Sequence, residues 1–129
     1  MNQNLFSGTG MAIPKIMLPK KSVDLEKWAV VACDQYTSEP EYWNQVADIT
    51  AEHPSTLKIT LPEIYLHDPD VDEKIERINQ TMSDYLENEV LEDIGQCFVL
   101  TERTFSSGLT RKGLVAALDL DCYDYSEKT

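Results

Sequence analysis

The sequence predicts an α+β fold (or α/β), in which two main helices pack on a mixed β-sheet and the chain ends in a β-hairpin. Apolar residues recur at helical spacing between residues 70 and 90, and a capping motif near Ser38 marks the start of another helix. Several short apolar or alternating runs have strand character. The expected order of elements is therefore β-β-α-β-α-β-β.

The first two expected elements are strands. Residues 12–19 contain Pro14 and Pro19, which forbid a helix and favour an edge strand. The apolar, partly β-branched run Trp28–Cys33 is compatible with a buried strand. In domain terms, we expect an extended N-terminal segment over residues 1–22 and a single α/β domain over residues 23–129, because domains cluster at about 100–150 residues.

The middle of the chain is expected to hold both helices. Ser38 and Glu41 form a predicted capping box for the first, and His53-Pro54 ends it. Residues 56–61 then alternate in polarity, which is typical of a half-buried strand. The second helix is capped by Asp68 or Asp70, with Gly95 just past its end. Its apolar positions are Val71, Ile75, Ile78, Met82, Leu86 and Val90.

The last third of the chain predicts the hairpin. Residues 97–105 and 113–120 are strand-like, and residues 106–112 join them. Like the elements before them, these runs contain no internal repeat.

Charge and composition restrict the cellular compartments and the binding partners to be expected. The net charge is −12, and ten acids lie between Asp68 and Asp93 against Lys74 and Arg77, so nucleic acid is not an expected partner. The apolar runs are too short to cross a bilayer, so a membrane is not an expected partner either. Three cysteines without a C-x-x-C pair and an N-terminus without signal-peptide features favour the cytoplasm. No metal site is expected, and the residues specify no cofactor.

The polar segment between the run ending at Cys33 and the first helix is a candidate site, since ligands collect at strand ends and anions at helix N-termini. Asp34 is the predicted catalytic base, and Tyr36, Thr37 and Ser38 are predicted ligand-binding residues. A plainer interpretation is that Thr37 and Ser38 cap the helix while Asp34 satisfies a turn.

A second candidate lies in the connection between the last two expected strands. Ser106, Arg111 and Lys112 could hold a phosphate with backbone amides, although a simple hairpin connection explains the same residues. If this loop folds over the end of Trp28–Cys33, the two candidates form one pocket.

Three stretches, residues 28–43, 54–63 and 111–125, together resemble the N-terminal part of a bacterial and archaeal domain-of-unknown-function family, number ten-fifteen in that series. Ala32–Tyr36 replaces a proline-proline-tyrosine-aspartate turn found in many members. The resemblance implies that the chain is the N-terminal portion of a longer protein. It also implies a distant similarity to the ParB/sulfiredoxin-like superfamily, whose members include nucleotide-using enzymes and a free-serine kinase. No phosphate-binding motif of that superfamily is present residue for residue.

These observations lead to a functional hypothesis and an alternative. The first is a cytoplasmic nucleotide- or small-metabolite-binding domain of a larger enzyme, with a kinase-like phosphotransferase activity implied by the resemblance. The alternative is a non-catalytic protein-interaction or oligomerisation module, which would make a homo-oligomer the expected partner. The residues alone leave open whether the chain is catalytic.

Overall fold

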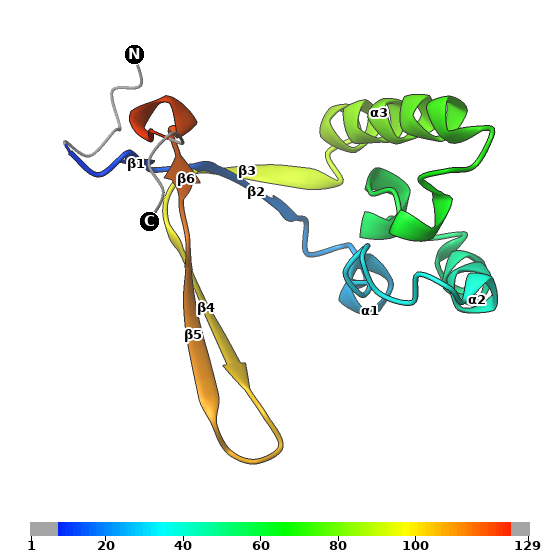
Figure 1. The fold of residues 1–129 in the computed structure, drawn as a ribbon, viewed down its shortest axis with the longest axis horizontal. Helices are drawn as coiled ribbons and strands as arrows, with labels where there is room; N and C mark the ends of the chain where they lie inside the picture. The colour runs from blue at the N-terminus through cyan, green and yellow to red at the C-terminus, as the bar shows by residue number, and fades with distance from the viewer. Residues whose placement is uncertain (1–7, 125–129) are drawn as a thin grey trace. The chain divides into compact units, whose positions relative to one another are not determined.

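The computed structural model describes residues 8–124, which divide into two compact units (Figure 1). The helical unit is Leu18–Glu92. The strand unit is Met1–Met17 with Asp93–Thr129, of which residues 8–17 and 93–124 are described. Helices and small antiparallel sheets occur together, so the chain is an α+β protein, as expected. The predicted division at residue 22 into a segment and a domain stays a prediction.

The strands of the described residues form three two-stranded sheets rather than the expected single mixed sheet. The pairs are β1 (Met11–Ala12) with β6 (Ala117–Leu118), β2 (Lys15–Pro19) with β3 (Leu91–Gln96), and β4 (Val99–Thr104) with β5 (Thr110–Val115). A larger sheet does not form in the described chain because the two runs expected to supply further strands, residues 28–33 and 56–61, have other structures.

The run Trp28–Cys33 is not a strand. Its first residue ends helix α1 (Leu25–Trp28), which begins because the Asp24 carboxylate accepts a hydrogen bond from the backbone N–H of Glu26 (3.0 Å). The Trp28 carbonyl accepts from the Thr56 hydroxyl (2.7 Å), and the Cys33 carbonyl accepts from the N–H of Glu63 (2.8 Å). These single contacts replace the ladder of bonds that a strand would make.

The helix expected near Ser38 is present as α2 (Pro40–Thr50), but the predicted capping box is wrong. Glu39 is the N-cap residue and makes no side-chain capping bond. Pro40 begins the helix instead, because its fixed φ suits the first helical position and its missing N–H needs no partner there. Trp43 anchors α2: its side chain is almost fully buried, and its indole N–H donates to the Tyr36 carbonyl (3.2 Å).

The alternating run Thr56–Leu61 is also not a strand. It begins with a short 3-10 helix, η1 (Thr56–Ile59), because the Ser55 hydroxyl accepts from the N–H of Leu57 (3.2 Å). A second 3-10 turn, η2 (Glu63–Tyr65), follows. The predicted strand over residues 56–61 is therefore wrong, because a 3-10 turn occupies its first four residues.

The long amphipathic helix is confirmed as α3 (Val71–Glu87), which packs against η1. The contact is polar as well as apolar: the N–H of the fully buried Ser55 donates to the Tyr85 hydroxyl (3.0 Å). Asp70 is the N-cap residue, but its carboxylate binds Lys74 rather than a backbone N–H. The helix ends before Val90, and residues 91–96, where only a glycine stop was expected, form β3.

The strand unit contains an antiparallel β4–β5 pair whose register runs from Val99↔Val115 to Thr104↔Thr110. The connection is shorter than expected. The Phe105 N–H donates to the Leu109 carbonyl (2.9 Å) and the Gly108 N–H to the Phe105 carbonyl (2.9 Å), with Gly108 at φ +87. This is the geometry of a three-residue hairpin loop that needs glycine at its left-handed position. Residues 111 and 112, expected in the loop, therefore lie in β5, and the chain continues through β6 into η3 (Leu120–Cys122).

Candidate functional site

A hollow of about 510 Å³ opens in the surface of the helical unit. Its walls come from α2, η1, the segment joining η1 to η2, η2 itself and the buried side of α3. The volume lies within the range of about 300–1,000 Å³ that is usual for small-molecule sites. We refer to this feature as the cationic hollow, for the reason given below.

Apolar and uncharged polar side chains make up most of the lining. Trp43 and Tyr65 supply aromatic surface, while Leu57, Leu61 and Ile78 supply aliphatic surface. Hydrogen-bonding groups are contributed by Asn44, Thr60 and Thr81. An apolar floor with a few polar groups is the usual composition of a site that binds a small molecule.

The charged residues of the lining are all basic: Lys58, Lys74 and Arg77. Among the described residues, no Asp or Glu lines the hollow. This is unexpected on charge alone, because the helical unit contains 17 acidic and six basic residues, a net charge of −11. The lining of the cationic hollow is thus basic within an acidic unit, and a basic lining favours anions.

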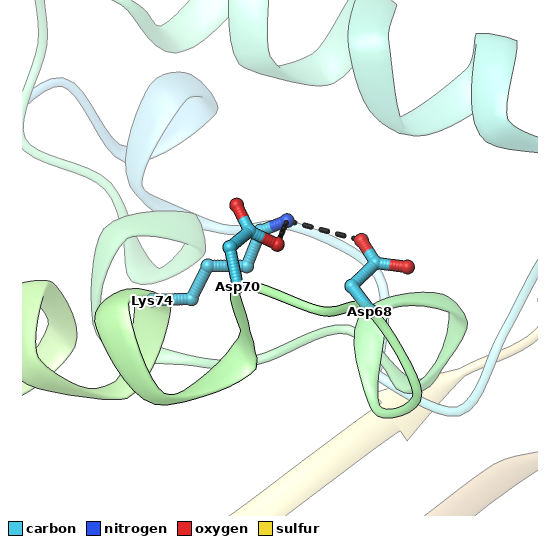
Figure 2. A network of polar contacts seen from close by, with 3 residues as sticks. All are labelled: Asp68, Asp70 and Lys74. Carbon is cyan, nitrogen blue, oxygen red and sulfur yellow. Dashed lines mark hydrogen bonds and ion pairs between the residues drawn. The ribbon is translucent and has the colours of Figure 1, made fainter.

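Lys74 is held in place by two carboxylates. Its ammonium lies 3.1 Å from an oxygen of Asp68 and 3.2 Å from one of Asp70, and Figure 2 shows it directed at both. It also lies 4.5 Å from the centre of the Tyr65 ring, a cation–π contact. The hydrogen bond to Asp68 is the main cause that raises the pKa of Lys74, with Asp70 adding to it, because both carboxylates stabilise the charged ammonium.

Lys58 and Arg77 are held differently. The Lys58 ammonium donates to the carbonyls of Ala51 (2.9 Å) and His53 (2.7 Å), just beyond the end of α2. A cation there complements the negative end of the helix dipole. Arg77 is exposed and makes no salt bridge to a carboxylate of the described residues. Arg77 is therefore the cation whose charge is least compensated.

The predicted site before α2 forms an exposed turn. The Asp34 carboxylate accepts from the side-chain amide of Gln35 (3.3 Å), and Tyr36 has a left-handed φ of 52 and stacks on Tyr42 with ring centres 3.9 Å apart. Thr37 and Ser38 are exposed. The catalytic role of Asp34 and the ligand-binding roles of the other three residues stay predictions.

A second hollow, of about 480 Å³, lies beside this turn. It is lined by Ser38 and the start of α2, including the carboxylates Glu39 and Glu41. Two carboxylates at a helix N-terminus complement the dipole themselves and repel a second anion. The geometry there is less suited to a phosphate than that of the cationic hollow.

The second predicted site belongs to the strand unit. Ser106 is in the hairpin loop, Arg111 lies 5.7 Å from the Phe105 ring centre, and Lys112 is 3.6 Å from Glu102. Since the two predicted sites lie in different units, their union in one pocket stays a prediction. Their ligand-binding roles stay predictions as well.

The residues of the cationic hollow were not singled out from the sequence, although one signal points to them. Lys74 and Arg77 are the two bases in the acidic run from Asp68 to Asp93, and with Ile78 and Thr81 they lie at helical spacing. Lys58 carries no comparable signal. In residues 8–124, no group of three or more His, Cys, Asp or Glu side chains is arranged to hold a metal ion, and no helix is long and apolar enough to span a membrane.

The fold and this site together define an α+β protein with a basic binding hollow in an acidic unit. Residues 16–128 match the model of the family described as "Protein of unknown function (DUF1015)", so the chain belongs to that family. Neither a curated protein nor a solved structure matches it. This match confirms the family that the three sequence stretches indicated. The more distant similarity to the ParB/sulfiredoxin-like superfamily stays a prediction.

Proposed function

We propose that the helical unit binds a small anionic metabolite or nucleotide in the cationic hollow, through its phosphate or carboxylate group. One observation carries the proposal: three basic residues and no acidic residue among the described ones line a hollow in a unit of net charge −11. The rest of this negatively charged unit repels anions, so anion binding to it depends on the basic lining of the hollow.

The hydrogen-bonding capacity of the three cations supports the proposal. An ammonium has three N–H donors, and Lys58 and Lys74 each use two of theirs on groups of the protein. The guanidinium of Arg77 presents a planar fork of donors that suits a bidentate carboxylate or phosphate. We assign Arg77 the main anion contact, with the two lysines adding charge at the edges.

The rest of the lining bears on the kind of ligand. Leu57, Leu61 and Ile78 can cover an aliphatic portion, and the hydroxyls of Thr60 and Thr81 can meet polar substituents. Lys74 covers one face of the Tyr65 ring, so a planar base could stack only on the other. A compact metabolite therefore fits this surface better than a nucleotide held by base stacking.

The test is direct binding to the intact chain. Isothermal titration with ADP, ATP, pyrophosphate and small carboxylates should show saturable binding of at least one of them. Arg77→Gln should weaken that binding about 10- to 100-fold, because a charge-assisted hydrogen bond contributes about 1.5–3 kcal/mol. Lys27→Gln is the matched control, since it removes one charge from the same unit outside the hollow. Equal weakening by both variants, or no binding of any probe, overturns the proposal.

The kinase-like activity that the family resemblance implies is a further part of this proposal. In it, the bound anion is a phosphorylated substrate or nucleotide and Asp34 is the base that accepts a hydroxyl proton. Incubation of the longest available form of the protein with ATP or ADP and a panel of amino acids should show phosphate transfer, which Asp34→Asn should abolish. Binding without transfer would retain the metabolite site and remove the kinase activity.

A further inference from the structure

The β4–β5 hairpin presents two different faces, because side chains alternate along a strand and directly opposed residues share a face. One face carries the complementary pair Glu102 and Lys112 (3.6 Å). The other, which we call the arginine face, is defined by these residues: Val99, Thr101, Arg103, Phe105, Arg111, Gly113 and Val115.

The arginine face holds an unfavourable charge pair. Arg103 and Arg111 lie directly opposite each other in the register, and their guanidinium carbons are 5.3 and 5.7 Å from the centre of the same Phe105 ring. Neither makes a salt bridge to a carboxylate of residues 8–124. Like charges directly opposite on paired strands are destabilising, and a bound pair of carboxylates would reverse that effect.

Helix α3 carries a complementary surface, in which partly exposed apolar side chains lie beside acidic ones. Ile75, Met82 and Leu86 are 41–49% exposed at helical spacing, so they form an apolar stripe that is about half exposed in the described chain. Beside it lie Asp72 and Glu76, a like-charge pair one turn apart. No Lys or Arg of the described residues forms a salt bridge with either of them.

The two surfaces are complementary in charge and similar in length. The arginine pair is separated across the strands and the acidic pair along the helix axis, so with the hairpin aligned along α3 the long arginine side chains span the difference to reach the two carboxylates. Apolar side chains accompany each pair, with Val99, Phe105 and Val115 on the hairpin. The stripe from Ile75 to Leu86 is about 16 Å long, and residues 99–105 of the hairpin extend about 20 Å.

We propose that the arginine face of one copy of this chain docks on the α3 stripe of a second copy, with Arg103 and Arg111 paired to Asp72 and Glu76. In a dimer with two-fold symmetry the contact forms twice. Each contact then needs only about half of the roughly 1,200–2,000 Å² that a stable interface buries. None of these residues lines the cationic hollow, so the inference is independent of metabolite binding.

Charge reversal on the intact chain tests the pairing. Sedimentation at low salt should show a dimer that dissociates as salt is raised, because the Debye length falls from about 10 Å at 0.1 M to about 3 Å at 1 M. Arg103→Glu with Arg111→Glu should weaken dimerisation at least about 30-fold, as should Asp72→Lys with Glu76→Lys. An equimolar mixture of these two double variants should restore a dimer containing one of each, since both contacts are then complementary again.

The control exchanges charges on the opposite hairpin face. Glu102→Lys with Lys112→Glu leaves the net charge and the arginine face unchanged and should leave the dimer intact. Circular dichroism of every variant separates loss of docking from loss of folding. The inference is overturned if the wild-type chain stays monomeric at every protein concentration measured. It is also overturned if the charge-reversed variants still dimerise, or if the mixture of folded variants fails to pair.

Discussion

The helical unit and the strand unit differ in both charge and burial. The helical unit has a net charge of −11, whereas the strand unit has six acidic and five basic residues and a net charge of −1. The helical unit buries the side chains of Val23, Trp43 and Tyr85. In the described part of the strand unit, Ala12 is the one buried hydrophobic side chain. Its leucines are 56–68% exposed at these positions: Leu100, Leu109, Leu114, Leu118 and Leu120.

This difference shows where each unit obtains its structure. The helical unit is held by side chains that bridge residues far apart in the sequence, such as Ser55 with Tyr85 and Thr56 with Trp28. The hairpin of the strand unit is held by backbone ladder bonds and a glycine-containing loop, both of which are local. Substitutions of side chains should therefore affect the two units very unequally.

The largest effect is expected for the buried indole of α2. Trp43→Ala should lower the free energy of unfolding by about 3–5 kcal/mol, because it leaves a cavity and removes the hydrogen bond to the Tyr36 carbonyl. Leu100→Ala, in the strand unit, should change it by less than about 0.5 kcal/mol. Urea unfolding followed by circular dichroism compares the two. Similar losses for both would mean that the units do not differ in this way.

A smaller effect is expected where α3 meets η1. Tyr85→Phe removes the hydroxyl that accepts from the buried Ser55 N–H, and the free energy of unfolding should fall by about 1–3 kcal/mol. Hydrogen exchange at the Ser55 amide should accelerate accordingly. Tyr42→Phe serves as the control, since no hydrogen bond joins its hydroxyl to a described residue. An unchanged Ser55 exchange rate would show that this contact does not hold η1.

The smallest effects concern pH, and the two units should respond at opposite ends of the scale. In the strand unit, the ion pair with Lys15 (3.0 Å) is the main cause that lowers the pKa of Asp93, and the Gly95 N–H adds to it. A pKa lowered on folding stabilises the fold above the unfolded-state value, and this contribution is lost as pH falls through the folded-state value. Lys15→Met should make the acid side of the stability profile shallower.

In the helical unit, the dependence of stability on pH has the opposite sign. The pKa of Lys74 is raised on folding, so its contribution is fully present below the unfolded-state value of 10.5 and is lost as pH rises through the folded-state value. Asp68→Asn should flatten the alkaline side of the profile, because it removes the main cause of the raised pKa of Lys74. Thermal unfolding measured across the pH range checks both variants, and an alkaline side that Asp68→Asn leaves unchanged would contradict the role assigned to this ion pair.

The sequence by itself determined the α+β class, the helices α2 and α3 and the family. Both helices are long enough for the 3.6-residue period to be clear, and neither needs a particular partner to be recognised. The class follows from the mixture of helical and strand-like patterns. The family follows from residue identity in three separate stretches, which is independent of any packing.

Tertiary structure decided the short elements. Residues 28–33 and 56–61 have patterns too short to separate a strand from a turn, and contacts from about 30 positions away selected the turn. Side-chain competition also changed the caps, since Asp70 was predicted to cap α3 but binds Lys74 instead. A carboxylate close to both a backbone N–H and an ammonium binds the one that tertiary packing orients toward it. The sequence alone does not specify that orientation.

The candidate site shows the same limit. The cationic hollow draws on residues from Trp43 to Thr81, and its basic character arises because packing brings Lys58 beside Lys74 and Arg77 while it turns the acids of α3 outward. Charge along the sequence predicted only a strongly acidic region. The local sign of the potential depends on which side chains share a surface, and that is a property of the folded chain rather than of its composition.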